Sequence, residues 1–233
     1  MISNTTHSAL LVIDMEQGFL SPDSPHCVPM AAGIVPAVTR AVEVARAKGI
    51  PVFFVKRLYR YDGSDVELSR WAGWQAGGRA MGPGSTGPAS AQAPEGLRPQ
   101  PGDYTIIKPR WSAFFQTELD LILRRLGVRT VILAGTATPN CVRTTAYDAM
   151  ALDYNVVLLS DGTASRTADI QRANLQDMAA VGAVVMTVAA FESYDGHTVA
   201  DPLADVRADR DACGLAPELF GQEDGNVTVT DRW

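Results

Sequence analysis

The stretch Thr130–Ser165 constrains the fold of this chain more than any other part of the sequence. Its apolar run Thr130–Ala134 ends at Gly135, and an amphipathic segment opens at Cys141, six residues later. A second apolar run follows at 155–159. A strand, a turn, a helix and the next strand form a βαβ unit. The stretch therefore predicts two parallel strands, with a cysteine where the turn meets the helix.

The same alternation of apolar runs and helical patterns recurs along the chain. Continuous apolar runs are typical of strands that are buried on both faces of a parallel sheet. Besides 130–134 and 155–159, the predicted strands are 9–13, 51–55, 104–107 and 183–188, and the predicted helices outside the βαβ unit are 31–48, 118–126 and 166–181. This order predicts an α/β fold with three layers, α/β/α, around a mostly parallel, six-stranded, Rossmann-like sheet.

One long segment, 56–102, lacks this regularity. It is rich in Gly, Ala, Pro and Ser over much of its length, and Trp71 and Trp74 lie in its one short helical pattern. A loop of this length in a compact domain is usually functional or mobile. Because strands are predicted on both sides, we interpret 56–102 as an irregular crossover that covers a site within a single domain, 1–233. An acidic, irregular tail, 189–233, with a strand candidate at 226–230, completes that domain.

Composition and charge exclude several classes of protein. Hydrophobic residues make up 46% of the chain and charged residues 20%, as in globular proteins. The net charge of −6 argues against a nucleic-acid surface. No apolar run reaches 18 residues, and no basic region precedes the first one, so we expect neither a membrane span nor a signal peptide. Three cysteines without CxxC spacing favour a reduced, cytoplasmic protein.

Metal and nucleotide cofactors are also not expected. The three histidines are scattered and form no HxH or HxxxH pattern, which argues against a histidine-based metal site. The first strand is followed by DMEQGF and not by GxGxxG, which argues against a dinucleotide-binding dehydrogenase. The remaining partner class is a small-molecule substrate.

Three reactive residues are each predicted to lie just after a strand, at the same edge of the sheet. Asp14 ends the first strand, Lys108 ends the third, and Cys141 follows the fourth by a turn. Sites in parallel α/β sheets form outside the carboxyl ends of the strands, so we expect these three side chains to converge. The structural alternatives are a buried cysteine without chemistry and an ion pair at the edge of the sheet.

Such a cluster has the parts for acyl transfer. The first turn of a helix carries unpaired N–H groups and a partial positive charge, which favours a thiolate and can hold an oxyanion. No histidine is placed to act as the base, so Asp14 is the candidate. Lys108 would favour both the carboxylate and the thiolate.

The three segments that contain these residues can be compared, as a set, with known protein families. ALLVIDMEQGF contains Asp14, IIKPRWSAF contains Lys108, and VILAGTATPNCVRTTAYDA contains Cys141. The set resembles the isochorismatase-like cysteine hydrolase family, which includes nicotinamidases, N-carbamoylsarcosine amidases and ureidoacrylate amidases. The resemblance spans roughly Ala9 to Val188. It implies that Cys141 is the nucleophile, Asp14 the general acid and base, and Lys108 their electrostatic partner.

The resemblance also implies further features of the site. These are a cis peptide at Thr136–Ala137, an oxyanion hole made by the N–H groups of Ala137 and Cys141, and a homodimer or homotetramer. Phe19 and Phe115 match positions that line the pocket in the family, and Trp111 is a third candidate. Ordinary core packing is the alternative for these rings.

The sequence departs from the family at two places, of which the second narrows the expected activity. Pro139 stands within the elbow, where it suits the entry to a helix. The segment RLYRYDGSDVELSR after the second strand has no histidine, which argues against the Asp-x-His metal site of nicotinamidases. Its Arg57 and Arg60, with Arg110, are candidates for a substrate carboxylate or for surface ion pairs.

We therefore expect a metal-independent cysteine amidohydrolase that cleaves a C–N bond of a small amide, ureide or lactam through an acyl-thioester on Cys141. The alternatives are an isochorismatase-type ether hydrolase, which would not need the thiol, and a non-catalytic relative that acts as a binding protein.

Overall fold

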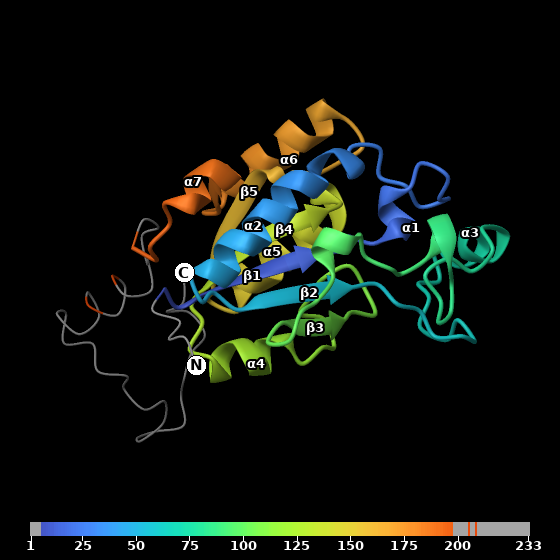
Figure 1. Ribbon diagram of the computed structural model, residues 1–233, viewed down its shortest axis with the longest axis horizontal. Helices are drawn as coiled ribbons and strands as arrows, with labels where there is room; N and C mark the ends of the chain where they lie inside the picture. Colours follow the sequence, from blue (N-terminus) through green and yellow to red (C-terminus); the bar gives the residue numbers. More distant parts are fainter. Residues whose placement is uncertain (1–5, 198–204, 206–207, 209–233) are drawn as a thin grey trace, which may run out of the picture. The chain divides into compact units, whose positions relative to one another are not determined.

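Six parallel strands form one sheet in the computed structural model, which describes residues 6–197 together with residues 205 and 208. The order in the sheet is β3-β2-β1-β4-β5-β6 (Figure 1). The strands are β1 (Ser8–Ile13), β2 (Val52–Lys56), β3 (Tyr104–Ile107), β4 (Thr130–Thr136), β5 (Asn155–Ala164) and β6 (Val184–Met186). The order of connection reverses between β1 and β4, which makes their carboxyl ends the expected place for a ligand.

Helices cover both faces of this sheet. One face packs against α2 (Val35–Ala47) and α7 (Val188–Glu192), and the other against α4 (Leu119–Arg125), α5 (Arg143–Ala151) and α6 (Ala168–Ala180). Alternate residues of one strand enter different layers, because successive side chains point to opposite faces. In β1, Leu10 and Val12 join the core on the α2 side, whereas Leu11 and Ile13 join the core on the α5 side.

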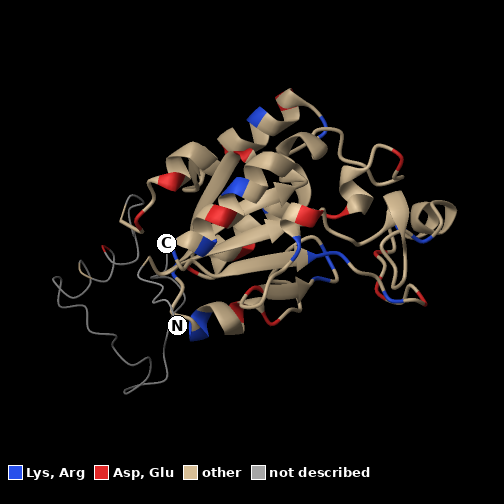
Figure 2. Cartoon of the chain, in the orientation of Figure 1, with Lys and Arg blue, Asp and Glu red and all other residues tan. Residues whose placement is uncertain are grey.

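Charge is absent from the middle of the sheet. Figure 2 shows the central strands β1 and β4 without Lys, Arg, Asp or Glu, and every residue of both strands is buried. The predicted three-layer α/β fold is confirmed. Among the described residues, no helix has the length and apolar character needed to cross a bilayer.

Short helices lie in the segments that connect the strands and the longer helices. They are α1 (Gln17–Leu20), η1 (Ala32–Ile34), α3 (Trp71–Ala76), η2 (Gly87–Ala89), η3 (Glu95–Leu97) and the π-helical turn η4 (Thr138–Val142). Segment 57–103 joins β2 to β3. Figure 1 shows α1 and α3 beyond the arrowheads of the strands, at the carboxyl end of the sheet.

The end of the described chain differs from the prediction. Residues 188–192 form α7, although they were assigned to the last strand and the irregular tail. The Thr187 side chain accepts a hydrogen bond from the Ala190 N–H at 3.1 Å and caps this helix, whose Phe191 is fully buried. Capping and burial together stabilise a helix too short for its periodicity to be seen.

The predicted domain boundaries remain untested. Contacts divide the chain into two units, Met1–Val199 and Ala200–Trp233. The strand predicted at 226–230 and Cys213 lie outside the described residues.

Candidate active site

Asp14 stands immediately after β1 in an unusual backbone conformation. Its φ is +51°, a region that non-glycine residues seldom adopt and that is enriched at functional sites. Its N–H still donates to the Val55 carbonyl at 2.9 Å, and its side chain is buried. The neighbouring strand contributes Gly135, which has a φ of +114° and pairs with Ile13. A Cβ at Gly135 would lie 2.0 Å from the Ile13 carbonyl oxygen, so only glycine fits beside Asp14.

Lys108 occupies the equivalent position after β3. Its N–H donates to the Lys56 carbonyl at 3.0 Å, which continues the pairing of β3 with β2. The side chain is fully buried, and its Nζ lies 2.9 Å from Asp14 Oδ2, 3.5 Å from Cys141 Sγ and 3.2 Å from the Arg110 carbonyl oxygen. An ammonium has three N–H donors, and three acceptors surround this one. A single buried cation therefore joins the carboxylate to the thiol.

The cysteine lies in the turn after β4. The Thr136–Ala137 peptide is cis, at the position that the resemblance indicates, and Pro139 lies in the first turn of η4. Thr138 Oγ1 donates to the Ala164 carbonyl at 3.0 Å and ties this turn to β5. Cys141 itself is only 4% exposed. The local sequence thus holds the thiol at a fixed point on the carboxyl edge of the sheet.

A threonine on α5 links the cysteine turn to the segment after Lys108. Thr145 Oγ1 donates to the Cys141 carbonyl at 2.6 Å and accepts from the Ala113 N–H at 3.0 Å. Thr145 is fully buried, so no water competes for these hydrogen bonds. The nucleophile and the loop that follows its lysine are therefore held together through one hydroxyl.

The thiol is less acidic than the helix position alone suggested. Burial raises the pKa of Cys141, and the Asp14 charge raises it further, whereas the Lys108 and Arg57 charges act in the opposite direction. The net direction is upward because burial and Asp14 outweigh the two cations, whereas the Lys108 charge favours the thiolate as expected. At neutral pH Cys141 keeps its proton, and attack by the sulfur requires a base.

A second buried ion pair lies beside the first, and the sequence analysis did not identify it. Arg57 follows β2 directly, is fully buried, and places Nη1 2.6 Å from Glu67 Oε1 and Nη2 4.0 Å from Cys141 Sγ. The prediction that placed Arg57 on a substrate carboxylate or in a surface ion pair is wrong, because its partner is internal. Its position in the sequence could have identified Arg57, since Asp14, Arg57 and Lys108 each immediately follow one of three neighbouring strands.

Another buried carboxyl lies near Asp14. Glu16 is 1% exposed, and its Oε1 accepts from the Arg57 N–H at 3.1 Å. Burial and the negative charge of Asp14 raise the pKa of Glu16 well above its usual value. Both effects favour the neutral form of Glu16, and the carboxyl group that contacts Lys108 is that of Asp14.

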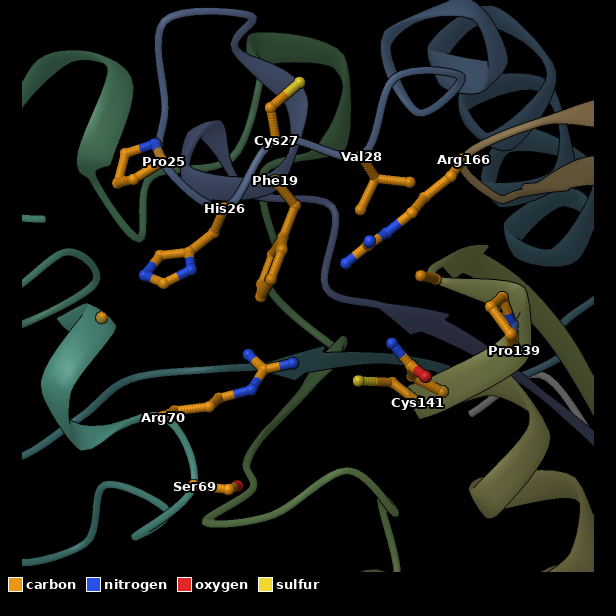
Figure 3. A pocket seen from close by; sticks show the side chains of 13 residues that line it. Phe19, Pro25, His26, Cys27, Val28, Ser69, Arg70, Pro139, Cys141 and Arg166 are labelled. Atoms are coloured by element: carbon orange, nitrogen blue, oxygen red, sulfur yellow. The ribbon is translucent and has the colours of Figure 1, made fainter.

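A cavity of about 340 Å³ opens over the cysteine. In Figure 3 the side chains of Phe19, Arg70, Arg166 and Cys141 point into one space, whereas the Cys27 sulfur points away from it. The wall comes from α1, segment 25–28, the crossover and the cysteine turn: Phe19, Pro25, His26, Cys27, Val28, Ser69, Arg70, Gly73, Ala137, Pro139, Asn140, Cys141 and Arg166. This lining contains two arginines and no Asp or Glu.

The imidazole in this wall adds no fixed charge. Burial lowers the pKa of His26, and the charge of Arg70 lowers it further. The neutral form therefore prevails at pH 7, and the positive charge of the cavity comes from Arg70 and Arg166.

The three predicted pocket rings have different locations. Phe19 lines the cavity, and 6% of it is exposed. Trp111 packs against the core on the α5 side, with the Arg70 guanidinium 6.0 Å from its ring centre, and Phe115 is 48% exposed. Neither Trp111 nor Phe115 is part of the cavity wall, because the loop after Lys108 carries them away from it.

Trp71 and Trp74 pack within the crossover segment that supplies part of the cavity wall. Trp74 is buried and donates from Nε1 to the Ala80 carbonyl at 2.9 Å, and its ring contacts those of Trp71 and Tyr59. Ser69, Arg70 and Gly73 bring the same segment to the cavity. Within the described part of the chain, no group of three His, Cys, Asp or Glu side chains could hold a metal ion.

Comparisons with known proteins agree with this architecture. The model of the Isochorismatase domain matches residues 8–190. A solved isochorismatase family protein from Desulfovibrio vulgaris superposes with a TM-score of 0.76 at 41% identity, covering 80% of this chain and 97% of that one.

Three curated relatives show the range of activities among similar proteins. A probable inactive nicotinamidase of Arabidopsis thaliana is 40% identical, over 81% of this chain and 96% of its own length. An N-carbamoylsarcosine amidase of Arthrobacter is 30% identical, over 87% and 80%. A ureidoacrylate amidohydrolase of Azorhizobium caulinodans is 29% identical, over 79% and 88%. Sequence, fold and site together show that the chain belongs to the isochorismatase family of hydrolases.

Proposed function

We propose that this protein is a cysteine amidohydrolase that cleaves the C–N bond of a small amide or ureide carrying a carboxylate. One observation carries the proposal: Lys108 Nζ lies 2.9 Å from Asp14 Oδ2 and 3.5 Å from Cys141 Sγ, beneath a cavity. A base, a nucleophile and a cation that stabilises both anionic forms are thus in mutual contact.

The proposed reaction begins with proton transfer from Cys141 Sγ to Asp14. The sulfur attacks the carbonyl carbon, and the N–H groups of Ala137 and Cys141 hold the resulting oxyanion. Asp14 then gives its proton to the leaving nitrogen, the C–N bond breaks, and an acyl-thioester remains on Cys141. Asp14 next takes a proton from water, the hydroxide attacks the thioester, and the acid leaves while the thiol regains its proton.

The charge of the cavity supports a substrate with a carboxylate. Arg70 and Arg166 line it, and no Asp or Glu is part of the lining. A guanidinium binds a carboxylate in a planar, two-pronged geometry. N-carbamoylsarcosine and ureidoacrylate, the compounds named for two relatives, are both carboxylates.

The test is ammonia release from a panel of amides and ureides, with liquid chromatography for lactams. Wild type should hydrolyse at least one anionic member, and Cys141→Ala should lose at least about 1,000-fold of that activity while it remains folded. Cys27→Ala is the matched control, because its sulfur points away from the cavity.

Two other results would contradict the proposal. Ether hydrolysis by Cys141→Ala would indicate an isochorismatase-type reaction without a thiol. Substrate binding without turnover in wild type would indicate a binding protein. A homodimer or homotetramer and a cytoplasmic location stay predictions from the sequence, and light scattering measures the first.

A further inference from the structure

The Arg57 guanidinium is buried and contacts three groups, one of which is the Cys141 sulfur. Arg57 is fully buried, with Nη1 held by Glu67 Oε1 at 2.6 Å and by the Pro109 carbonyl at 3.3 Å. Its Nη2 faces Cys141 Sγ at 4.0 Å, within the range of a hydrogen bond to sulfur. Beyond these two oxygen partners, the guanidinium therefore also reaches the nucleophile.

A second layer fixes the orientation of this guanidinium. Tyr59 donates its hydroxyl hydrogen to Glu67 Oε2 at 2.8 Å, and the Arg57 guanidinium lies 5.5 Å from the centre of the Tyr59 ring. The carboxylate is thus held by both neighbours, and it holds the arginine in turn. Such a fully buried network gives the guanidinium one position relative to the sulfur.

We propose that Arg57 is a catalytic residue, a second cation that stabilises the Cys141 thiolate and is held in place by Glu67 and Tyr59. The inference rests on the proposed role of Cys141 as nucleophile. When Asp14 takes the thiol proton, negative charge moves onto Sγ, and both Lys108 and Arg57 then face it. Two cations in a water-poor site lower the free energy of that charge separation more than one.

The charged groups around the sulfur come from several elements. Asp14 and Lys108 follow β1 and β3, Arg57 follows β2, and Glu67 lies in the crossover. Burial raises the pKa of both Glu16 and Tyr59, which favours their neutral forms. Arg57 and Glu67 are therefore the two charges that can be changed without touching Asp14 or Lys108.

The test uses two substitutions that should shift the pKa of the Cys141 thiol in opposite directions. The pH dependence of Cys141 alkylation by iodoacetamide, followed by peptide mass spectrometry, reports the thiol pKa without any substrate. Arg57→Met should raise that pKa by about one unit or more, because an opposite charge at this distance is removed. Glu67→Gln should lower it, because the guanidinium then loses its counter-charge.

A purely structural role for the pair predicts a different outcome. Loosening of the same buried network would move the pKa in one direction in both variants, or leave it unchanged, and either result overturns the proposal. Where Arg57→Met does not fold, the sign in the isosteric Glu67→Gln variant decides alone. Exposed Arg172→Met and Asp169→Asn on α6 are the matched controls.

Catalysis provides an independent readout. Arg57→Met should lower kcat by about tenfold to a hundredfold with little change in KM, since the cation acts on the sulfur and not on bound substrate. Because alkylation needs no turnover, a failed amidase screen would leave the thiol result intact, and the two proposals fail separately.

Discussion

The floor and the wall of the cavity are built in different ways. We call Asp14, Arg57, Lys108 and Cys141 the floor: they follow neighbouring parallel strands, are almost completely buried, and border the cavity through Cys141. The wall consists of the other lining residues, which come from α1, segment 25–28, the crossover, the cysteine turn and Arg166 after β5. The paired strands of the sheet fix where the floor residues lie, whereas most of the wall comes from connecting segments without a repeating pattern. The difference suggests that the floor determines the chemistry and the wall determines the substrate.

The largest effect is expected from removing the base of the floor. Asp14→Asn should lower kcat by about 1,000-fold or more, because the amide cannot accept the thiol proton. It also leaves Lys108 as a buried charge without its counter-ion, which costs about 3–5 kcal/mol of folding free energy. Steady-state kinetics with urea unfolding measures both, and the exposed Asp23→Asn is the control. If the kcat of Asp14→Asn stayed within tenfold of wild type, Asp14 would not be the catalytic base.

Gly135 tests whether the sheet positions the floor. Gly135→Ala would place a methyl group 2.0 Å from the Ile13 carbonyl, at a φ of +114°, so β1 or β4 must shift beside Asp14. The expected cost is about 2–4 kcal/mol of unfolding free energy, together with a loss in kcat. Gly33→Ala, which meets no atom within 4 Å, should change neither quantity. Equal behaviour of the two variants would contradict the claim.

The wall should affect binding and leave the chemical step alone. Arg166→Gln and Arg70→Gln should each raise KM for an anionic amide by about 10- to 100-fold, the worth of a charge-assisted hydrogen bond. A neutral amide of the same size should show almost no change in KM. A fall in kcat for both kinds of substrate would instead place these arginines in the chemistry.

The smallest effect concerns Glu16, the buried carboxyl group beside Asp14. Burial raises the pKa of Glu16 in the folded protein, so its stabilising contribution is complete below the pKa of the unfolded chain and declines as pH rises toward the folded pKa. Glu16→Gln should therefore match wild type near pH 4 and be more stable at pH 7, by about 1.4 kcal/mol for each pKa unit removed. Urea midpoints across this range measure the difference. A variant that is less stable at pH 7 would show an ionised Glu16.

The sequence predicted the floor better than the wall for a physical reason. Apolar runs locate the ends of parallel strands, and Asp14, Lys108 and Cys141 were found because each is reactive and stands at such an end. Arg57 has the same position after β2 but was assigned elsewhere, because its partner Glu67 lies in a loop without periodicity. Most of the wall escaped prediction for the same reason: the resemblance indicated Phe19 and Phe115, with Trp111 as a further candidate, and only Phe19 lines the cavity.

The most direct measurement of the central claim is the partition of the acyl group between water and hydroxylamine. If an acyl-thioester forms on Cys141, hydroxylamine competes with water for it, and a hydroxamate or hydroxyurea appears in proportion to the hydroxylamine concentration. The account predicts this product with wild type and its absence with Cys141→Ala. Turnover that yields only the acid at every hydroxylamine concentration, or a hydroxamate that persists without the thiol, would contradict it.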